Sequence, residues 1–343
     1  MRIKITRTLI FLGLLLVFST VNLFAQDTNV IFEQGNEFLR TRKYNEAVEK
    51  FKQIVALRPG LAEAYFNLGL SYYNLKKYDE AIASFHEFIR LKPEAVNGLA
   101  MLGNAFDYSG KYSEALAVYQ KALAIEPDNA RIYFEIGVAH ERQKKYTESE
   151  QAYRKAIALD SNYSDAYAAL GNVFESLKRP ADALLAYQTA VKLDSRNAVT
   201  YKNFGDYYRR QKKSADAIKA YQTAIALDSQ YAEAYLNLGS VYYGDKQYTE
   251  SLESYQNAVR YNPEWATANL YLADVYRELK RYADAEKSYL KAIELNARNG
   301  NAFYWLGVNY LLQGNKQSAK TQYEKLKLID NALAEKLLTF INR

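Results

Sequence analysis

The amino-acid sequence predicts an all-α fold made of tandem helix pairs, with one pair every 34 residues. The first observation is a series of small residues at this spacing: Gly35, Gly69, Gly103, Gly137, Gly171, Gly205, Gly239, Ala273 and Gly307. The second is a series of aromatic residues that runs from Phe51 to Tyr323 with the same period. The third is the composition, because long Ala/Leu/Lys/Glu-rich segments with only five prolines favour helices over strands.

Two helices are expected in every 34-residue unit. Counted from residue 28, large residues at positions 4, 7 and 11 surround the small residue at position 8, as on one face of a helix. The second helix carries a small residue at position 20 and an aromatic residue at position 24. The small side chains should let the two backbones approach closely, while the rings fill the space around them. Since one pair cannot bury its apolar face alone, successive pairs should stack into a solenoid.

Residues at the expected boundaries support this division. Position 18 holds good N-cap residues for the second helix, namely Asn45, Asp79, Ser113, Thr147 and Thr249. Pro180 should begin the second helix of the fifth unit, where a missing N–H is tolerated. The predicted units are residues 28–61, 62–95, 96–129, 130–163, 164–197, 198–231, 232–265, 266–299 and 300–333.

The last residues, NALAEKLLTFINR, predict a C-terminal capping helix over residues 334–343. Leu333, Leu337 and Phe340 lie at helical spacing among polar residues. Such a helix would cover the apolar face that the ninth unit otherwise exposes.

The N-terminal segment, MRIKITRTLIFLGLLLVFSTVNLFAQ, predicts export. Three basic residues precede an apolar run and a final alanine, which is the layout of a signal peptide over residues 1–25. An uncleaved membrane anchor is the alternative, because the apolar run is long and Leu23 is large for a cleavage motif. We expect a periplasmic or secreted protein. Without this segment the formal net charge of +6 falls to +3, so nucleic acid or an anionic membrane is not an expected partner.

The sequence offers few residues for catalysis. The absence of cysteine excludes disulfides, thiolate metal sites and a cysteine nucleophile. The two histidines lie in different units without metal-ligand spacing, with His140 expected to be a packed ring and His86 to lie on the outer surface. No glycine-rich phosphate loop occurs. We therefore expect no enzyme activity, no cofactor and no metal.

Paired basic residues at positions 15 and 16 recur through the chain, as in Lys76–Lys77 and Lys144–Lys145. The most basic stretch, Arg209–Lys213, includes one such pair. We interpret these pairs as cations at the C-terminal end of the first helix, where they interact favourably with the helix dipole. A nucleic-acid site is the less favoured interpretation.

The second unit resembles the tetratricopeptide repeat family. The residues that carry the resemblance are Tyr65, Leu68–Gly69, Tyr72, Ala81, Phe85 and Pro93. The resemblance extends over residues 28–333 and implies a right-handed α-solenoid of antiparallel helix pairs. In the family, positions 2, 5, 6, 9, 12 and 13 of the first helices line a concave groove that binds partners.

The resemblance places candidate partner-binding residues on this groove. They are Asn36, Phe66, Asn67, Tyr73, Asn172, Lys202, Asn203, Asp206, Arg209, Asn237, Tyr243, Tyr271, Tyr304 and Trp305, with Asp274 and Arg277 at equivalent positions. Trp265 is expected at the groove rim.

Asparagine at position 9 is twice followed by asparagine at position 6 of the next unit. The pairs are Asn36 with Asn67 and Asn172 with Asn203. Because an amide both donates and accepts, such a pair can hold an extended peptide backbone. Family members that grip a peptide C-terminus add lysine at position 5, where this chain has Phe32 and Ala168. We therefore do not expect that carboxylate clamp.

Tyrosine is abundant, and 23 of its 32 occurrences fall at positions 4, 11, 17 and 24, where they are expected to form the scaffold. The others are Tyr73, Tyr108, Tyr163, Tyr207, Tyr231, Tyr243, Tyr261, Tyr271 and Tyr304. Aromatic groove residues commonly anchor protein partners. Partial burial between units is an equal alternative for Tyr271, Tyr304 and Trp305.

These features predict an exported, non-catalytic scaffold that binds an extended peptide or a protein, in an envelope-associated assembly. A module that binds a glycan or cell-wall polymer is the first alternative, because tyrosine and tryptophan rings stack on sugars and amides bond to hydroxyl groups. An accessory subunit of an envelope enzyme is the second.

Overall fold

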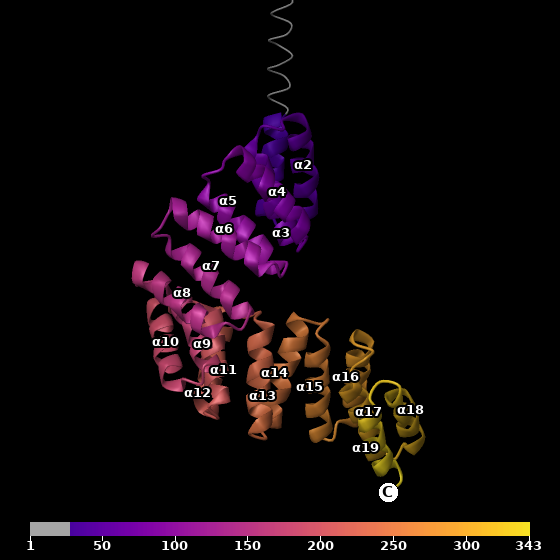
Figure 1. Cartoon of the computed structure of the whole chain (residues 1–343). Helices are drawn as coiled ribbons and strands as arrows, with labels where there is room; N and C mark the ends of the chain where they lie inside the picture. Colours follow the sequence, from indigo (N-terminus) through magenta and orange to yellow (C-terminus); the bar gives the residue numbers. More distant parts are fainter. Residues whose placement is uncertain (1–27) are drawn as a thin grey trace, which may run out of the picture. The chain divides into compact units, whose positions relative to one another are not determined.

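The computed structural model describes residues 28–343, so the predicted signal peptide at residues 1–25 lies outside the described residues. Residues 28–343 form helices joined by short turns, and they contain no strand. Consecutive helices lie side by side in antiparallel pairs (Figure 1). The predicted all-α class and the successive packing of helix pairs are confirmed.

The chain divides into two compact units between Val173 and Phe174, inside α9 (Ser164–Ser176). The helices before α9 are residues 28–40, α2 (Tyr44–Leu57), α3 (Ala62–Asn74), α4 (Tyr78–Leu91), α5 (Val96–Tyr108), α6 (Tyr112–Ile125), α7 (Ala130–Arg142) and α8 (Tyr146–Leu159). Those after it are α10 (Pro180–Leu193), α11 (Ala198–Arg210), α12 (Ser214–Leu227), α13 (Ala232–Gly244), α14 (Tyr248–Tyr261), α15 (Ala266–Glu278), α16 (Tyr282–Leu295), α17 (Gly300–Leu312), α18 (Lys316–Lys327) and α19 (Asn331–Ile341). From α3 to α18, odd-numbered helices are the first helices of the predicted 34-residue units and even-numbered helices are the second.

In most helix pairs the core is built around one ring from the second helix. Ala81 and Phe85 of α4 are fully buried. A Cβ atom added to Gly69 of α3 would lie 2.6 Å from the Phe85 ring, and one added to Gly137 of α7 would lie 2.4 Å from the ring of Tyr153. These separations are well inside van der Waals contact. The glycine at position 8 therefore makes room for the ring at position 24. This explains the series of small residues more specifically than the predicted close approach of the two backbones.

The predicted N-caps of the second helices are wrong, because these helices begin at position 17. Their N-caps are position-16 residues such as Lys43, Lys77 and Lys145, whose side chains make no capping bond. The residue at position 15 already reverses the chain, so the second helix can begin at position 17. The residues that were predicted as caps lie in the first turn: Asn45, Asp79, Ser113, Thr147 and Thr249. Pro180 does begin α10.

Position 15 adopts the left-handed backbone conformation. Lys144, for example, has φ of 59°, its N–H donates to the Glu141 carbonyl at 2.8 Å, and the Lys145 N–H donates to the His140 carbonyl at 2.9 Å. These two bonds form a Schellman motif that closes α7. The basic pairs at positions 15 and 16 therefore lie beyond the first helix. The dipole argument fails for position 16, because Lys145 is the N-cap of α8.

Replacing Lys144 with glycine should stabilise the protein. The left-handed conformation costs a non-glycine residue about 1–2 kcal/mol, while glycine loses about 0.5–1 kcal/mol more conformational entropy on folding. The expected net gain is therefore about 0.5–1 kcal/mol, measured as the midpoint of urea unfolding. Gly110 has φ of 81° at the same position of its unit, so Gly110→Lys is the reciprocal control and should lose stability. Equal midpoints for wild type and both variants would contradict this prediction.

The capping helix α19 begins at Asn331, three residues before the predicted start at residue 334, because the Asp330 side chain caps it by accepting from the Leu333 N–H at 3.0 Å. Leu337 is fully buried, and a Cβ added to Gly307 would lie 2.5 Å from it. Leu337 thus occupies the place that the position-24 ring fills in other pairs. Phe340, which lies at the same helical spacing, is 45% exposed, and Ile341 is buried instead.

Among residues 28–343, no helix is both long enough and apolar enough to span a bilayer.

Candidate functional site

The candidate site lies on the surface formed by positions 2, 5, 6, 9, 12 and 13 of the first helices, which we name the first-helix face. In residues 28–173 it involves the helix at 28–40 with α3, α5 and α7. In residues 174–343 it involves α11, α13, α15 and α17.

The first asparagine pair forms as predicted. The Asn67 side-chain amide of α3 donates to the Asn36 carbonyl oxygen at 2.8 Å, and both residues are half-buried. Asn172 and Asn203 are also half-buried. Asn172 lies in the compact unit that ends at Val173 and Asn203 in the one that begins at Phe174, so their pairing stays a prediction.

Phe66 has both a packing role and a surface role. Its ring lies 5.8 Å from that of Phe85 and 5.0 Å from that of Phe88. The side chain also lines a pocket of about 310 Å³ together with Met101 and Arg131. Phe66 is therefore also a packing residue, because it covers the core of the second helix pair.

Tyr73 belongs to an aromatic cluster that sequence reasoning missed. Its ring lies 5.7 Å from Tyr78 and 5.5 Å from Tyr108. The Arg142 guanidinium lies 3.8 Å from the centre of the Tyr108 ring and is 2.7 Å from the Asp107 carboxylate. Burial raises the pKa of Asp107, and the Arg142 charge opposes that rise. Asp107 is at position 12 of its 34-residue unit, and Tyr108 and Arg142 are at position 13 of theirs. Applying the position count to these units would therefore have found them.

The tyrosines at position 24 have a second role on the first-helix face. Their rings are buried, but their hydroxyl groups reach polar residues on the face: Tyr119 to Asn104, Tyr153 to Glu141, Tyr187 to Glu175, Tyr221 to Asp206, Tyr255 to Ser240 and Tyr289 to Asp274. Sequence reasoning assigned these tyrosines to the scaffold alone. Each hydroxyl fixes the orientation of a surface polar group from below.

Lys202 and Asp206 are brought together with Asn237. The Lys202 ammonium lies 3.0 Å from Glu233 and 3.5 Å from Asp206, and its side chain is only 12% exposed. The Asn237 amide donates to Asp206 at 2.9 Å, and the Tyr221 hydroxyl donates to the same oxygen at 2.6 Å. These charges are largely satisfied within the protein, so Lys202 is a weak candidate for direct contact with a partner.

A pocket of about 290 Å³ gathers four of the predicted residues, namely Arg209, Tyr243, Tyr271 and Asp274. Its lining is Arg209 of α11, Ser240 and Tyr243 of α13, Tyr255 of α14, and Tyr271 and Asp274 of α15. The Arg209 side chain is 44% exposed, and its contact with Asp206 is 4.0 Å long. Tyr271 is 36% exposed, which favours the surface role over burial. Because it combines exposed aromatic and charged groups, this pocket is the best candidate for contact with a partner.

Asp274 lines this pocket from α15 and is held by the scaffold. The Tyr289 hydroxyl donates to its Oδ1 at 2.6 Å, and the Arg277 guanidinium is 4.0 Å away. Burial raises the pKa of Asp274 to about 6. Arg277 is only 10% exposed, since it pairs with Glu278 at 2.8 Å and lies 4.0 Å from the centre of the Trp305 ring.

The remaining aromatic candidates are mainly packing residues. Trp305 and Trp265 are half-buried against the core around α15, and Tyr304 is half-buried against the core around α18. The rings of Tyr304 and Trp305 lie 5.0 Å apart, edge to face. For these residues the structure favours the alternative of burial.

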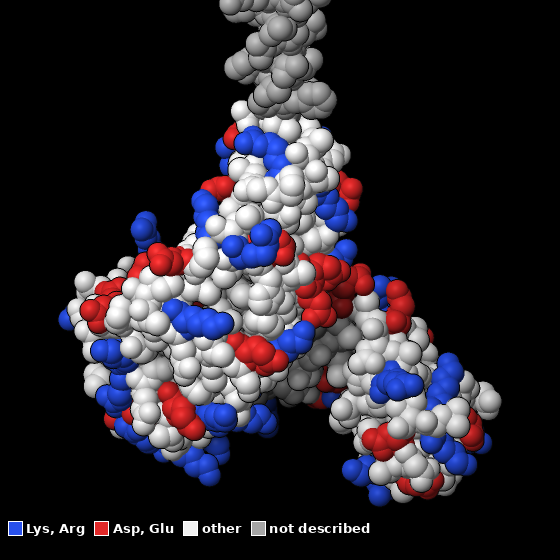
Figure 2. All heavy atoms as spheres, turned by 45° about the horizontal axis from the view of Figure 1, so that its top comes forward, with Lys and Arg blue, Asp and Glu red and all other residues white. Residues whose placement is uncertain are grey.

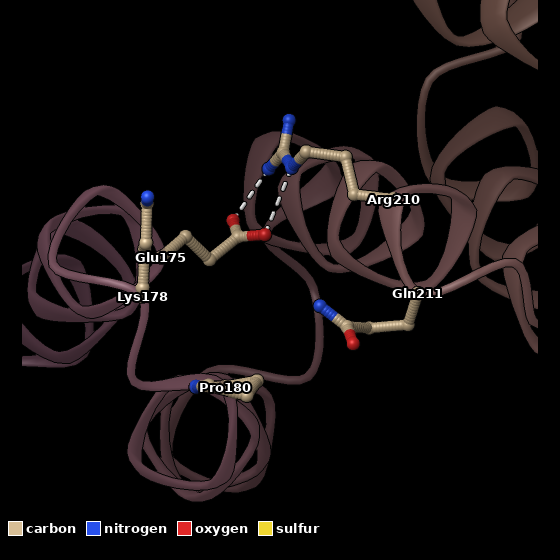
Figure 3. A pocket seen from close by; sticks show the side chains of 5 residues that line it. All are labelled: Glu175, Lys178, Pro180, Arg210 and Gln211. Atoms are coloured by element: carbon tan, nitrogen blue, oxygen red, sulfur yellow. Dashed lines mark hydrogen bonds and ion pairs between the residues drawn. The ribbon is translucent and has the colours of Figure 1, made fainter.

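Another pocket, of about 320 Å³, lies where α9 and α11 end and α10 begins (Figure 3). Arg210 holds Glu175 through two guanidinium nitrogens, and Glu175 also accepts from the Tyr187 hydroxyl at 2.9 Å. The Lys178 and Gln211 side chains flank this pair. Arg210 and Glu175 satisfy each other, and this pocket lacks the aromatic walls of the one at Tyr271.

The described residues show no sign of a metal site, because no three His, Asp or Glu side chains in residues 28–343 converge. His86 is exposed and His140 is half-buried, as expected. Lys and Arg side chains are scattered over the face drawn in Figure 2 rather than gathered into one basic field.

Comparison with known proteins identifies the family. Models of the tetratricopeptide repeat match residues 32–96, 130–163, 164–197, 242–299 and 281–327, and a model of the TPR repeat matches residues 103–144 and 205–246. No curated protein matches the chain.

Two solved structures show the same fold. The chain is similar to pilF of Pseudomonas aeruginosa, with 22% identity over 61% of this chain and 96% of that chain and a TM-score of 0.55. It is also similar to a chain of the APC/C hetero-tetramer Cut9–Hcn1, with 15% identity over 92% of this chain and 76% of that chain and a TM-score of 0.57. With its successive helix pairs and repeat matches, this chain belongs to the tetratricopeptide repeat family.

Proposed function

We propose that this protein is a non-catalytic interaction scaffold that binds an extended segment of a protein partner on its first-helix face. Its membership of the tetratricopeptide repeat family supports the scaffold role. The main support for the location of the binding site is the pocket lined by Arg209, Tyr243 and Tyr271. It is the place where these predicted residues, together with Asp274, line one pocket that includes exposed side chains.

The chemistry of this pocket suits a protein partner. Tyrosine and arginine are the residue types most often responsible for binding energy at interfaces. Arg209 and Tyr271 are exposed, and Ser240 is held by hydrogen bonds from the Tyr255 hydroxyl and to the Leu236 carbonyl. Because the Ser240 hydroxyl is already oriented, little of its conformational entropy is lost when a partner binds.

We also propose that the protein is exported and acts in an envelope-associated assembly. The support is the N-terminal sequence, in which basic residues precede the apolar run of a signal peptide. Cell fractionation, followed by N-terminal sequencing of the recovered protein, separates the alternatives. Cleavage near Ala25 supports a periplasmic or secreted protein, an intact N-terminus in the membrane fraction supports the anchor, and recovery in the cytoplasm contradicts export.

Replacing Tyr271 with alanine should weaken peptide binding at least tenfold, which corresponds to about 1.4 kcal/mol. The expected reason is the loss of an exposed ring that a partner would bury. The probes are peptides selected from a random display library against the purified protein, and affinity is measured by fluorescence anisotropy. Tyr243→Ala should act in the same direction, because Tyr243 lines the same pocket.

Tyr261→Ala is the matched control. Tyr261 is also 36% exposed, but it lies on the second helix α14 and stacks on Tyr235. Equal affinity losses for Tyr271→Ala and Tyr261→Ala would contradict the assignment of the first-helix face. If the library yields no peptide and the protein instead sediments with purified cell-wall polymer, the glycan alternative replaces this proposal.

A further inference from the structure

We infer that the pocket formed by α11, α13, α14 and α15 accepts the side chain of a lysine or arginine from the bound segment. This inference rests on the proposed function and adds the charge of the residue that the pocket selects.

The walls of the pocket are largely aromatic. Tyr243, Tyr255 and Tyr271 come from three consecutive helices and line the same space. The rings of Tyr255 and Tyr271 lie 5.7 Å apart in a tilted arrangement. Aromatic ring faces attract ammonium and guanidinium groups, and their edges also contact the aliphatic stems of these side chains. An acidic side chain gains no such attraction from the ring faces.

The acidic group in the pocket lining is Asp274. Its Oδ1 accepts from the Tyr289 hydroxyl at 2.6 Å and has the 4.0 Å contact with Arg277. Among the described residues, none donates a hydrogen bond to Oδ2. Burial raises the pKa of Asp274 to about 6, and the Tyr289 hydrogen bond and the Arg277 charge only partly oppose this rise. A carboxylate in this state is stabilised when a cation approaches it.

The neighbouring arginines provide that cation only in part. Arg277 is only 10% exposed and is held at 2.8 Å from Glu278 and against the Trp305 ring. Arg209 lies on the opposite helix, α11, where it is 44% exposed and faces Asp206 at 4.0 Å. Its exposed charge is screened by water far more than the buried charge of Asp274. The net preference of the pocket is therefore for a cation.

The test is a random peptide display selection against the purified protein, followed by affinity measurements on one selected peptide. We expect lysine or arginine to be enriched at one peptide position. Replacing that residue with norleucine should weaken binding to wild type at least tenfold. For the Asp274→Asn variant, the same norleucine replacement should weaken peptide binding less than threefold. The amide that this substitution introduces keeps an oxygen that accepts from the Tyr289 hydroxyl, so the variant should fold.

Asp284→Asn is the matched control. Asp284 lies on α16 and pairs with Arg281 through a side chain that is 38% exposed. It should retain the full preference for the basic residue. The norleucine comparison on wild type needs no variant, so it tests the inference even if Asp274→Asn unfolds.

The outcomes separate this inference from the proposed function. If no peptide is selected, the proposed function fails and the inference fails with it. If peptides bind but show no charge preference, or keep their preference for lysine on Asp274→Asn, the inference alone is wrong. Enrichment of an acidic residue, with binding lost on Arg209→Ala, would overturn it in favour of Arg209 as the determinant.

Discussion

Replacing Leu337 with alanine should destabilise the last helix pair by about 2–5 kcal/mol, the range measured for large-to-small changes in packed cores. Leu337 is fully buried on α19 and fills the space next to Gly307 of α17. In a repeat protein each unit is stabilised mainly by its neighbours, so the loss should be largest at the C-terminal end of the chain. The measurement is hydrogen exchange, with protection expected to fall in α17 and α18.

Phe340→Ala is the control for this prediction, because the Phe340 side chain is on the same helix and is 45% exposed. Its effect should stay within about 0.5 kcal/mol, as for most surface substitutions. Similar loss of protection in both variants would show that α19 caps the chain in some way other than through Leu337.

Replacing Gly137 with valine should destabilise the fourth helix pair by about 3 kcal/mol, at the upper end of the range for overpacked cores. The first added carbon alone would lie 2.4 Å from the fully buried ring of Tyr153. That ring cannot move outward freely, since its hydroxyl donates to Glu141 at 2.9 Å. The measurement is the apparent free energy of unfolding in urea.

Gly244→Val is the matched control, because Gly244 is also in a first helix but has no atom within 4 Å of an added Cβ. Its unfolding free energy should change by less than about 1 kcal/mol, the scale of helix propensity. Equal effects at the two glycines would mean that position 8 is not constrained by the position-24 ring. Ala273 shows that one methyl group is tolerated beside Tyr289, which is why the test uses the larger valine.

Much of the fold could be predicted because the period of 34 residues shows which side chains share a face. Gly69 and Phe85 are 16 residues apart in the sequence, yet their recurrence predicts that they meet. The helix starts were predicted less well. Asn45 is a good N-cap by residue type, but the left-handed Arg42 reverses the chain and leaves Lys43, two residues before Asn45, as the cap. Local preference was overruled there by the geometry of the turn.

The candidate site could be predicted only in part. The position count brought Arg209, Tyr243 and Tyr271 to one pocket, because all three lie on the same face of adjacent first helices. The same count gave Lys202 and Trp305 equal weight. Lys202 is instead bound to Glu233, and Trp305 covers Arg277. Spacing shows the direction of a side chain from its helix but not what occupies the space in front of it.

The sequence by itself determined the helix pairs, their order and the face of each first helix that is free of repeat-packing residues, since these follow from periodicity. Only the tertiary structure decided which polar groups on that face remain available. The hydroxyls of the buried Tyr221 and Tyr289 donate hydrogen bonds to Asp206 and Asp274. Whether such bonds form depends on side-chain conformations and on burial. Hydrogen bonds act over about 3 Å, a distance that the spacing of residues along a chain does not specify.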